Sequence, residues 1–156
     1  VFALAGRNRR PPRDPMNAIL SFSYALLLND CISAAEGVGL DPQLGFMHAV
    51  RPGRPALALD LMEELRSILC DRLALTLINR NQITPKHFEK RPGGAVSLTE
   101  KGRKVVVVAY QKRKQKEVAH EVAKRKMPLG LVPHVQARLL ARVIRDDMAE
   151  YLAFRC

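Results

Sequence analysis

The sequence predicts a mainly helical fold, a single domain spanning all 156 residues with one small β-hairpin. The length suits one domain, because domains usually run to roughly 100–200 residues. Hydrophobic residues make up 47% of the chain, which is enough for a core and well above the share in disordered proteins. Over most of the chain these residues recur at the three- and four-residue spacing of an amphipathic helix.

The first half of the chain predicts two long helices. The first is expected over residues 15–36, and Asp14 can cap it because its carboxylate accepts hydrogen bonds from the first turn. A loop rich in proline and glycine follows at residues 41–53. A second helix is expected over residues 55–78. It is hydrophobic nearly all round, which places it at the centre of the domain.

The second half predicts the hairpin and two more helices. Residues 83–98 alternate around an Arg-Pro-Gly-Gly turn, which is typical of a small β-hairpin. Thr99 can cap a third helix over about residues 100–124. Four consecutive valines in that segment favour a strand, so propensity and spacing conflict there, and the spacing is preferred. Pro133 opens a last helix, which the spacing carries to Met148.

The charge of the chain is large and unevenly placed. Of the net charge of +11, residues 1–13 contribute +4 and residues 101–126 contribute +8, whereas residues 14–100 sum to −2. One basic run alone could be a solvated helix face. Two runs that bracket an acidic body favour contact with a phosphate backbone, because each neutralised phosphate releases counterions. The 5% aromatic content without tryptophan argues against a surface of stacked rings.

Composition also bears on compartment and membrane association. Unbroken hydrophobic runs reach about six residues, short of the roughly 20 that a membrane span needs, so no membrane contact is expected. A membrane-surface helix at residues 101–126 is a weak alternative, because the basic stripe lacks Trp and Phe anchors.

Cys31, Cys70 and Cys156 offer neither a disulfide framework nor a Cys-x-x-Cys site, which favours the reducing cytoplasm. The chain opens without methionine and is interpreted as part of a longer product.

One group of residues could carry chemistry, a loop histidine followed by three acids. His48 lies in the loop, and Asp60, Glu63 and Glu64 lie in the second expected helix. Acids three and four positions apart share a helix face and repel one another unless a cation or a basic side chain neutralises them. A divalent ion completed by a histidine nitrogen is one interpretation. The alternative, which the residues alone favour, is that the glutamates pair with Arg66 or another basic residue and that His48 is buried and hydrogen-bonded.

The other histidines and motifs suggest no further chemistry. His87 and His120 have no acid or cysteine at ligand spacing and are expected on the surface. The sequence contains no Gly-rich phosphate loop, nucleophile elbow or His-Glu-x-x-His pattern. Kinases, P-loop NTPases, serine hydrolases and zincins therefore have no support from motifs.

Four blocks of sequence, taken in order, resemble a known family. They are Arg-Asn-Arg-Arg-Pro-Pro-Arg-Asp-Pro at the start of residues 7–22, Gly-Phe-Met-His at the end of residues 39–48, Arg-Pro-Gly-Arg-Pro at residues 51–55 and Leu-Asp-Leu-Met-Glu-Glu-Leu-Arg at residues 59–66. Together they resemble the C-terminal helical domain of the CRISPR-associated spacer-acquisition integrase, the Cas-one endonuclease family. The likeness extends to about residue 145. Within the family, this sequence is similar to the variant found in type I-C-like systems.

The resemblance implies a bound Mg²⁺ or Mn²⁺ ion, held by a glutamate, a histidine and a second acid. Its motifs assign the histidine to His48 and the last ligand to Glu63, with Asp60 as a supporting acid, and these three would be the catalytic residues. No position in this chain matches the first glutamate, and the family's N-terminal β domain is absent. Tyr24 falls in the helix that faces the family's active site, as a core residue or as a support of the metal ligands.

The function that the resemblance implies is metal-dependent DNA cleavage and strand transfer, which inserts new spacers into CRISPR arrays. Its partners would be double-stranded DNA (prespacer and CRISPR repeat), the Cas-two protein and a second copy of the chain. A chain lacking one metal ligand would be inactive alone. The alternative is a non-catalytic helical module for nucleic-acid binding or assembly. Contacts with the DNA backbone are expected from Arg7, Arg9, Arg10, Arg13, Lys112, Arg113 and Lys116.

Overall fold

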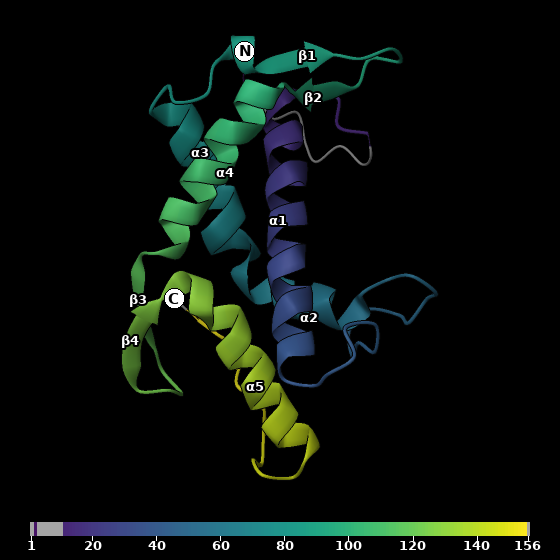
Figure 1. Ribbon diagram of the computed structural model, residues 1–156, viewed down its shortest axis with the longest axis vertical. Helices are drawn as coiled ribbons and strands as arrows, with labels where there is room; N and C mark the ends of the chain where they lie inside the picture. The colour runs from purple at the N-terminus through teal and green to yellow at the C-terminus, as the bar shows by residue number, and fades with distance from the viewer. Residues whose placement is uncertain (1, 3–10, 156) are drawn as a thin grey trace.

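One long helix, α1 (Pro15–Gly37), forms the axis around which the other helices pack (Figure 1). The computed structural model describes Phe2 and residues 11–155. Asp14 caps α1 as predicted, because its Oδ1 accepts a hydrogen bond of 2.8 Å from the backbone N–H of Asn17. The first predicted helix is therefore confirmed.

α1 is long and apolar enough, by length and composition, to cross a membrane. The short unbroken runs of the sequence did not reveal this, because polar residues interrupt the helix but leave an 18-residue window with a mean hydropathy of 1.4. In this structure α1 contacts α2, α4 and α5, and Ile19, Leu27 and Cys31 are completely buried. The core helix of a folded domain has the same composition as such a span.

A second, nearly continuous helical segment runs from α2 (Ala56–Leu65) through a π-helical turn, η1 (Arg66–Asp71), into α3 (Arg72–Asn79). This confirms the second predicted helix and its central position, since Leu57, Leu65, Leu69 and Leu77 are at most 1% exposed. The π turn was not predicted. The two parts have different neighbours, because α2 contacts α5 and α3 contacts α4.

The predicted hairpin is present at the end of the structure near the first turn of α1 (Figure 1). Strands β1 (Phe88–Lys90) and β2 (Val96–Leu98) are antiparallel, with Phe88 opposite Leu98. A 3₁₀ turn, η2 (Pro85–His87), precedes them. The turn between the strands needs its two glycines, because Gly93 and Gly94 have φ angles of 84° and 79°.

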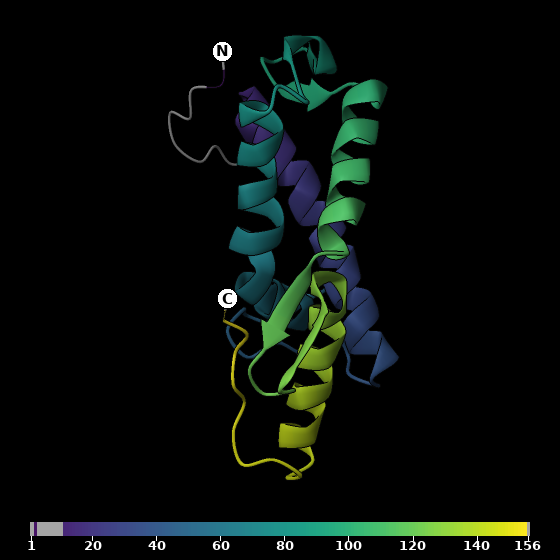
Figure 2. The same ribbon diagram turned by 90° about the vertical axis from the view of Figure 1, so that its left-hand side faces the viewer.

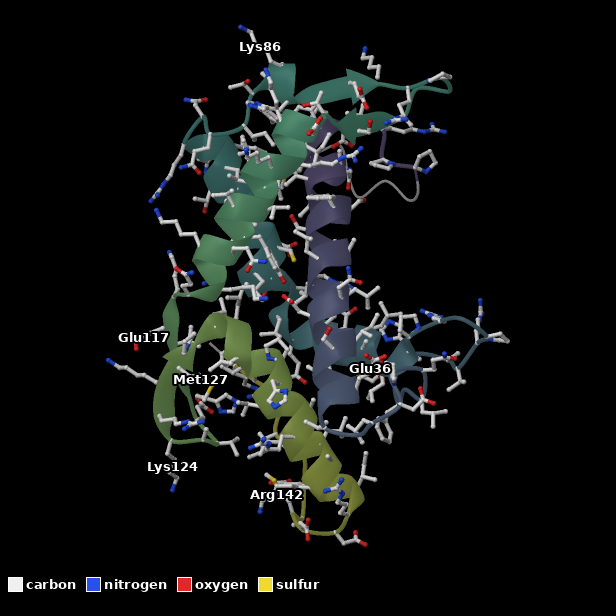
Figure 3. All side chains as sticks on the ribbon, viewed as in Figure 1. Glu36, Lys86, Glu117, Lys124, Met127 and Arg142 are labelled. Carbon is white, nitrogen blue, oxygen red and sulfur yellow. The ribbon has the colours of Figure 1, made fainter. Side chains whose placement is uncertain are left out.

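α4 (Glu100–Lys114) is shorter than predicted, and a second hairpin follows it. Strands β3 (Glu117–His120) and β4 (Arg125–Pro128) are antiparallel, so the predictions of a helix to residue 124 and of a single hairpin were wrong. The sequence gives no signal at this turn, which contains neither glycine nor proline and uses Lys124 at a φ of 49°. Lys124 extends outwards from it, whereas Met127 of β4 is buried (Figure 3).

The valine run stays helical because the core, rather than local propensity, decides its conformation. Val106 and Tyr110 lie one turn apart in α4 and are 0% and 1% exposed. Tyr110 also donates a hydrogen bond of 2.7 Å to Asp30 of α1. Packing of this kind overrides the small preference of β-branched residues for strands.

The chain ends in a helix and an irregular segment. A 3₁₀ turn, η3 (Leu129–Leu131), leads into α5 (Val132–Ile144), which begins as predicted and ends before Met148. Residues 145–155, here called the C-terminal strap, turn back and run alongside α5 (Figure 2). The strap has no helix or strand, so its position depends on side-chain anchors.

Candidate active site

The carboxylate of Asp60 fixes the loop that carries His48. Asp60 lies on α2 and is 7% exposed. Its Oδ2 accepts hydrogen bonds from the backbone N–H groups of Phe46 (2.6 Å) and Met47 (3.0 Å). Its Oδ1 accepts from the backbone N–H of His48 (3.0 Å) and lies 2.5 Å from Nδ1 of the same residue. One buried carboxylate thus holds three consecutive residues of the loop and the imidazole ring.

Close packing brings this loop to the first turn of α2. A Cβ atom at Gly45 would lie 2.7 Å from the carbonyl carbon of Ala56, a distance that Cβ atoms essentially never show. The carbonyl of Pro42 accepts a hydrogen bond of 2.9 Å from the backbone N–H of Leu57, one of the free donors at the helix start. The glycine of the Gly-Phe-Met-His block therefore has a packing role, and the loop and helix form one unit.

The contact with Asp60 also fixes the tautomer of His48. Burial alone would raise the pKa of Asp60, but the hydrogen bonds from the His48 side chain and the three backbone N–H groups together lower it below its ordinary value. An ionised carboxylate only accepts hydrogen bonds, so we assign the shared proton to Nδ1 of His48. In the tautomer that carries its proton on Nδ1, Nε2 has the lone pair, as in histidines that bind metals and donate their other N–H to a carboxylate.

Glu63, the second predicted ligand, forms an ion pair with Arg66, with 2.5 Å between Oε1 and Nη2. The side chain of Glu63 is 39% exposed. The Arg66 guanidinium lies 5.1 Å from the centroid of the Tyr24 ring, and the Tyr24 hydroxyl donates a hydrogen bond of 2.6 Å to Asp71. Tyr24 therefore links α1 to the ion pair, although its predicted role at the metal stays a prediction. The ion pair is the alternative that the sequence left open.

The three acids of α2 do not form the shared cluster that their spacing suggested. Asp60 binds the His48 loop, Glu63 binds Arg66, and Glu64 binds the C-terminal strap through the backbone N–H of Phe154 (2.6 Å). Among the residues that the structure describes, no three His, Cys, Asp or Glu side chains are placed to hold a metal ion. His48 and Glu63 remain two candidate ligands.

The basic residues predicted to contact DNA are only partly described. Arg13 is exposed just before α1, and Lys112 and Lys116 are exposed at the end of α4 and just after it. The other residues of the first basic segment, Arg7, Arg9 and Arg10, lie outside the described residues. The exposed ones are accessible to a phosphate backbone.

Arg113 has a structural contact that the sequence could not show. Its Nε donates a hydrogen bond of 2.7 Å to the carbonyl of Ile68 in the π turn. Burial, and to a smaller extent the nearby charge of Arg72, lowers the pKa of Arg113. Part of its guanidinium is therefore committed to holding α4 against η1.

Neither of the two histidines expected on the surface is fully exposed. His120 is 2% exposed, and its ring lies between Gln136 of α5 and the backbone N–H of Ala123. His87 is half-buried, and its Nδ1 accepts a hydrogen bond of 3.0 Å from the backbone N–H of Thr84. The prediction was wrong for His120, whose ring is held by Gln136 of α5 and by its own hairpin, whereas His87 is partly exposed and is held by the local turn at Thr84.

Comparisons with known proteins give the family of this helical domain and its histidine-bearing loop. The family model described as CRISPR associated protein Cas1 matches residues 1–112, most of the chain. The chain therefore belongs to the Cas1 family. It is 68% identical over 154 residues to CRISPR-associated endonuclease Cas1 1 of Moorella thermoacetica, which covers 99% of this chain and 45% of the relative. It is 48% identical to CRISPR-associated endonuclease Cas1 of Leptospira interrogans, covering 98% of this chain and 60% of that one.

Solved structures show the same fold. A Cas1 protein from Thermotoga maritima matches 92% of this chain and 44% of its own, with a TM-score of 0.84 and 28% identity. A casposase bound to integration product matches 92% of this chain and 41% of its own, with a TM-score of 0.85 and 26% identity. The chain spans about half the length of the curated relatives it matches.

Proposed function

We propose that this chain is the C-terminal helical domain of a metal-dependent DNA endonuclease and integrase, which inserts new spacers into the CRISPR arrays of a type I-C-like system. The observation that carries the proposal is the arrangement of His48, whose Nδ1 lies 2.5 Å from Oδ1 of the buried Asp60 carboxylate. The relatives named as Cas1 endonucleases and the similarity to a casposase bound to integration product support it.

His48 and Glu63 would hold the Mg²⁺ or Mn²⁺ ion, and Asp60 would orient the histidine. A carboxylate suits both cations, and an imidazole nitrogen is a donor that Mn²⁺ accepts more readily than the harder Mg²⁺, so the donor set fits Mn²⁺ better. When bound, such an ion polarises a scissile phosphate and activates water or a 3′-hydroxyl group. Glu63 must leave Arg66 to take part, and because the pair is partly exposed we expect a cost of about 1 kcal/mol, the upper end for surface ion pairs.

Two protein donors are too few for a tightly held ion. We propose that this chain alone binds Mn²⁺ weakly and has little nuclease activity, and that a further acidic ligand comes from another part of the complete protein. The complete protein would act in the cytoplasm of a prokaryote as a homodimer with Cas2. Solved Cas6-RT-Cas1–Cas2 complexes of similar fold support Cas2 as the partner.

The DNA would lie against the exposed basic residues Arg13, Lys112 and Lys116. Such side chains neutralise phosphates and position the duplex without reading its sequence. Prespacer DNA and the CRISPR repeat would both be bound in this way, because each is a double-stranded substrate with the same backbone.

A second candidate is a non-catalytic module for nucleic-acid binding or assembly. The observation that favours it is the Glu63–Arg66 ion pair, together with the finding that the described residues contain no three-ligand group. In that case the acids of α2 would serve the fold alone.

A chimaera separates the two candidates. This chain would replace the 154 matching residues of the Moorella thermoacetica relative, which shares 68% of them. His48→Ala and Glu63→Ala should each abolish Mn²⁺-dependent strand transfer and leave duplex binding intact, with Glu117→Ala in β3 as an exposed control. Normal strand transfer by either variant would exclude the metal-ligand roles and favour the non-catalytic module.

A further inference from the structure

The carboxylate of Glu64 is the point at which three parts of the structure meet. Its Oε2 accepts hydrogen bonds from Nε2 of Gln136 in α5 (2.7 Å) and from the backbone N–H of Phe154 in the strap (2.6 Å). Its Oε1 accepts a very short hydrogen bond from the hydroxyl of Tyr151. Among the described residues no lysine or arginine forms an ion pair with it.

The hydrogen bonds continue beyond Glu64 into the second hairpin. Gln136 is 1% exposed, and its Oε1 lies 3.1 Å from Nε2 of His120 at the end of β3. Its Nε2 also donates to the Tyr151 hydroxyl (2.8 Å) and to the carbonyl of Leu152 (3.2 Å). Burial, and then the hydrogen bond to Glu64, raises the pKa of Tyr151, so its hydroxyl stays protonated.

Glu64 also lies one helical turn from Asp60, on the same side of α2. Both residues line one apolar groove of about 590 Å³. Phe46 and Met47 of the His48 loop line the same groove, and so do Tyr151 and Ala153 of the strap. The strap and the His48 loop are therefore walls of one groove, and Glu64 binds one wall while Asp60 binds the other.

We propose that Glu64 is a positioning residue for the candidate active site. By holding the strap, it keeps that wall of the groove in place and so keeps Asp60 and His48 in register. Three donors from the strap and α5 converge on this carboxylate, and charged acceptors make the stronger hydrogen bonds. Without it, the backbone N–H of Phe154 would lose its acceptor, and the Gln136 amide would lose one of its three. The effect on activity rests on the proposed function, whereas the effect on the loop does not.

Amide hydrogen exchange, followed by NMR on this chain, tests the coupling directly. The backbone amides of Phe46, Met47 and His48 report on the Asp60 contacts, and that of Phe154 reports on the strap. In Glu64→Ala we expect all four to exchange at least about tenfold faster. The buried amide of Leu27 in α1 should not change, and Glu121→Ala in the exposed turn of the second hairpin is the matched control.

Faster exchange at Phe154 with unchanged exchange in the loop would overturn the proposal, because Glu64 would then anchor only the strap. Unchanged exchange at all four amides would overturn it as well. If Glu64→Ala does not fold, Tyr151→Phe decides, since it keeps the carboxylate and removes one donor; the same four amides should then exchange faster, by a smaller factor.

The ring of His48 gives a second measurement, which would not change if Glu64 only anchored the strap. Glu64→Gln should shift the ¹⁵N resonances of the imidazole towards a mixture of tautomers, because the Asp60 contact loosens. In the chimaera the same variant should lower kcat for strand transfer more than it changes KM for DNA. If His48→Ala has no effect on strand transfer, the proposed function fails, whereas the exchange result still decides the role of Glu64.

Discussion

Nδ1 of His48 lies 2.5 Å from Oδ1 of Asp60, and the same carboxylate holds the backbone of three consecutive loop residues. Asp60 therefore contributes to the stability of the fold as well as to the candidate site. Asp60→Ala should lower the free energy of unfolding by about 2 kcal/mol, because the part-buried N–H groups of three loop residues and the His48 ring lose their acceptor. Urea denaturation measures this, and a loss below about 1 kcal/mol would contradict the arrangement. Asp60→Asn, which keeps the volume, should cost less.

Glu63, unlike Asp60, should contribute little to the stability of the fold. Its ion pair with Arg66 is partly exposed, so Glu63→Gln should change the free energy of unfolding by less than about 0.5 kcal/mol. In the chimaera, the same variant should weaken Mn²⁺ binding, measured by titration calorimetry. A variant that is clearly destabilised but binds Mn²⁺ normally would show that Glu63 serves the fold.

Gly45 is the glycine of the loop with the least room for a side chain. A Cβ at Gly45 would meet the backbone of Ala56 at 2.7 Å, so Gly45→Ala should destabilise the protein by about 1–3 kcal/mol. Gly37→Ala is the control, because its Cβ would meet only ordinary contacts of at least 3.5 Å with His134. Thermal unfolding of both variants measures the difference, and equal melting temperatures would show that the loop can move away from α2.

The protein should lose stability at high pH because two of its cysteines are buried. Burial, followed by nearby acids, raises the pKa of Cys31 and of Cys70 from 9.0 to about 12. Both thiols are neutral in the folded protein below pH 9, and the stability that they contribute is lost as the pH rises from 9 towards 12. Each thiol should lower the free energy of unfolding by up to about 1.4 kcal/mol per pH unit in that window. Cys31→Ala/Cys70→Ala should show a flatter pH dependence of unfolding, and an unchanged slope would refute the assignment.

The lysines of α4 should differ in their roles. Lys112 is exposed, whereas Nζ of Lys114 lies 2.8 Å from both carboxylate oxygens of Asp30. Lys112→Ala should reduce the slope of log affinity for duplex DNA against log salt by about 1 and leave the melting temperature unchanged. Lys114→Ala should lower the melting temperature. The proposed DNA surface is wrong if Lys112→Ala leaves the salt dependence unchanged.

The fold was largely predictable because hydrophobic spacing and cap residues carry most of the information about helices. Asp14 and Thr99 cap α1 and α4 as expected, by accepting hydrogen bonds from the backbone three residues ahead. The second hairpin escaped prediction since its turn uses Lys124 at positive φ, a conformation that no local residue type announces. Its position depends on His120, which contacts Gln136 of α5 and Phe154 of the strap, and on Met127, which is buried in the core.

The candidate site was predictable as a set of residues but not as a geometry. Spacing placed Asp60, Glu63 and Glu64 on one helix, and the resemblance named His48 and Glu63. Spacing could not tell which of the three carboxylates would bind the loop, which would bind an arginine and which would bind the strap. The partners that decide this come from residues up to 90 positions away in the chain. The nearest signal for the loop contact was Gly45, which marks a close approach of the backbone.

The π turn divides one helical sequence between two partners. A single extra residue in a helical turn rotates everything after it by about 100° about the helix axis. α2 can thus direct its hydrophobic side to α5, while α3 directs its own to α4. Arg113 secures the change in direction at the carbonyl of Ile68. The candidate active-site acids on α2 and the basic helix α4 are therefore set at a fixed angle by the length of Arg66–Asp71, and loss of one residue there would aim them at different parts of the proposed DNA duplex.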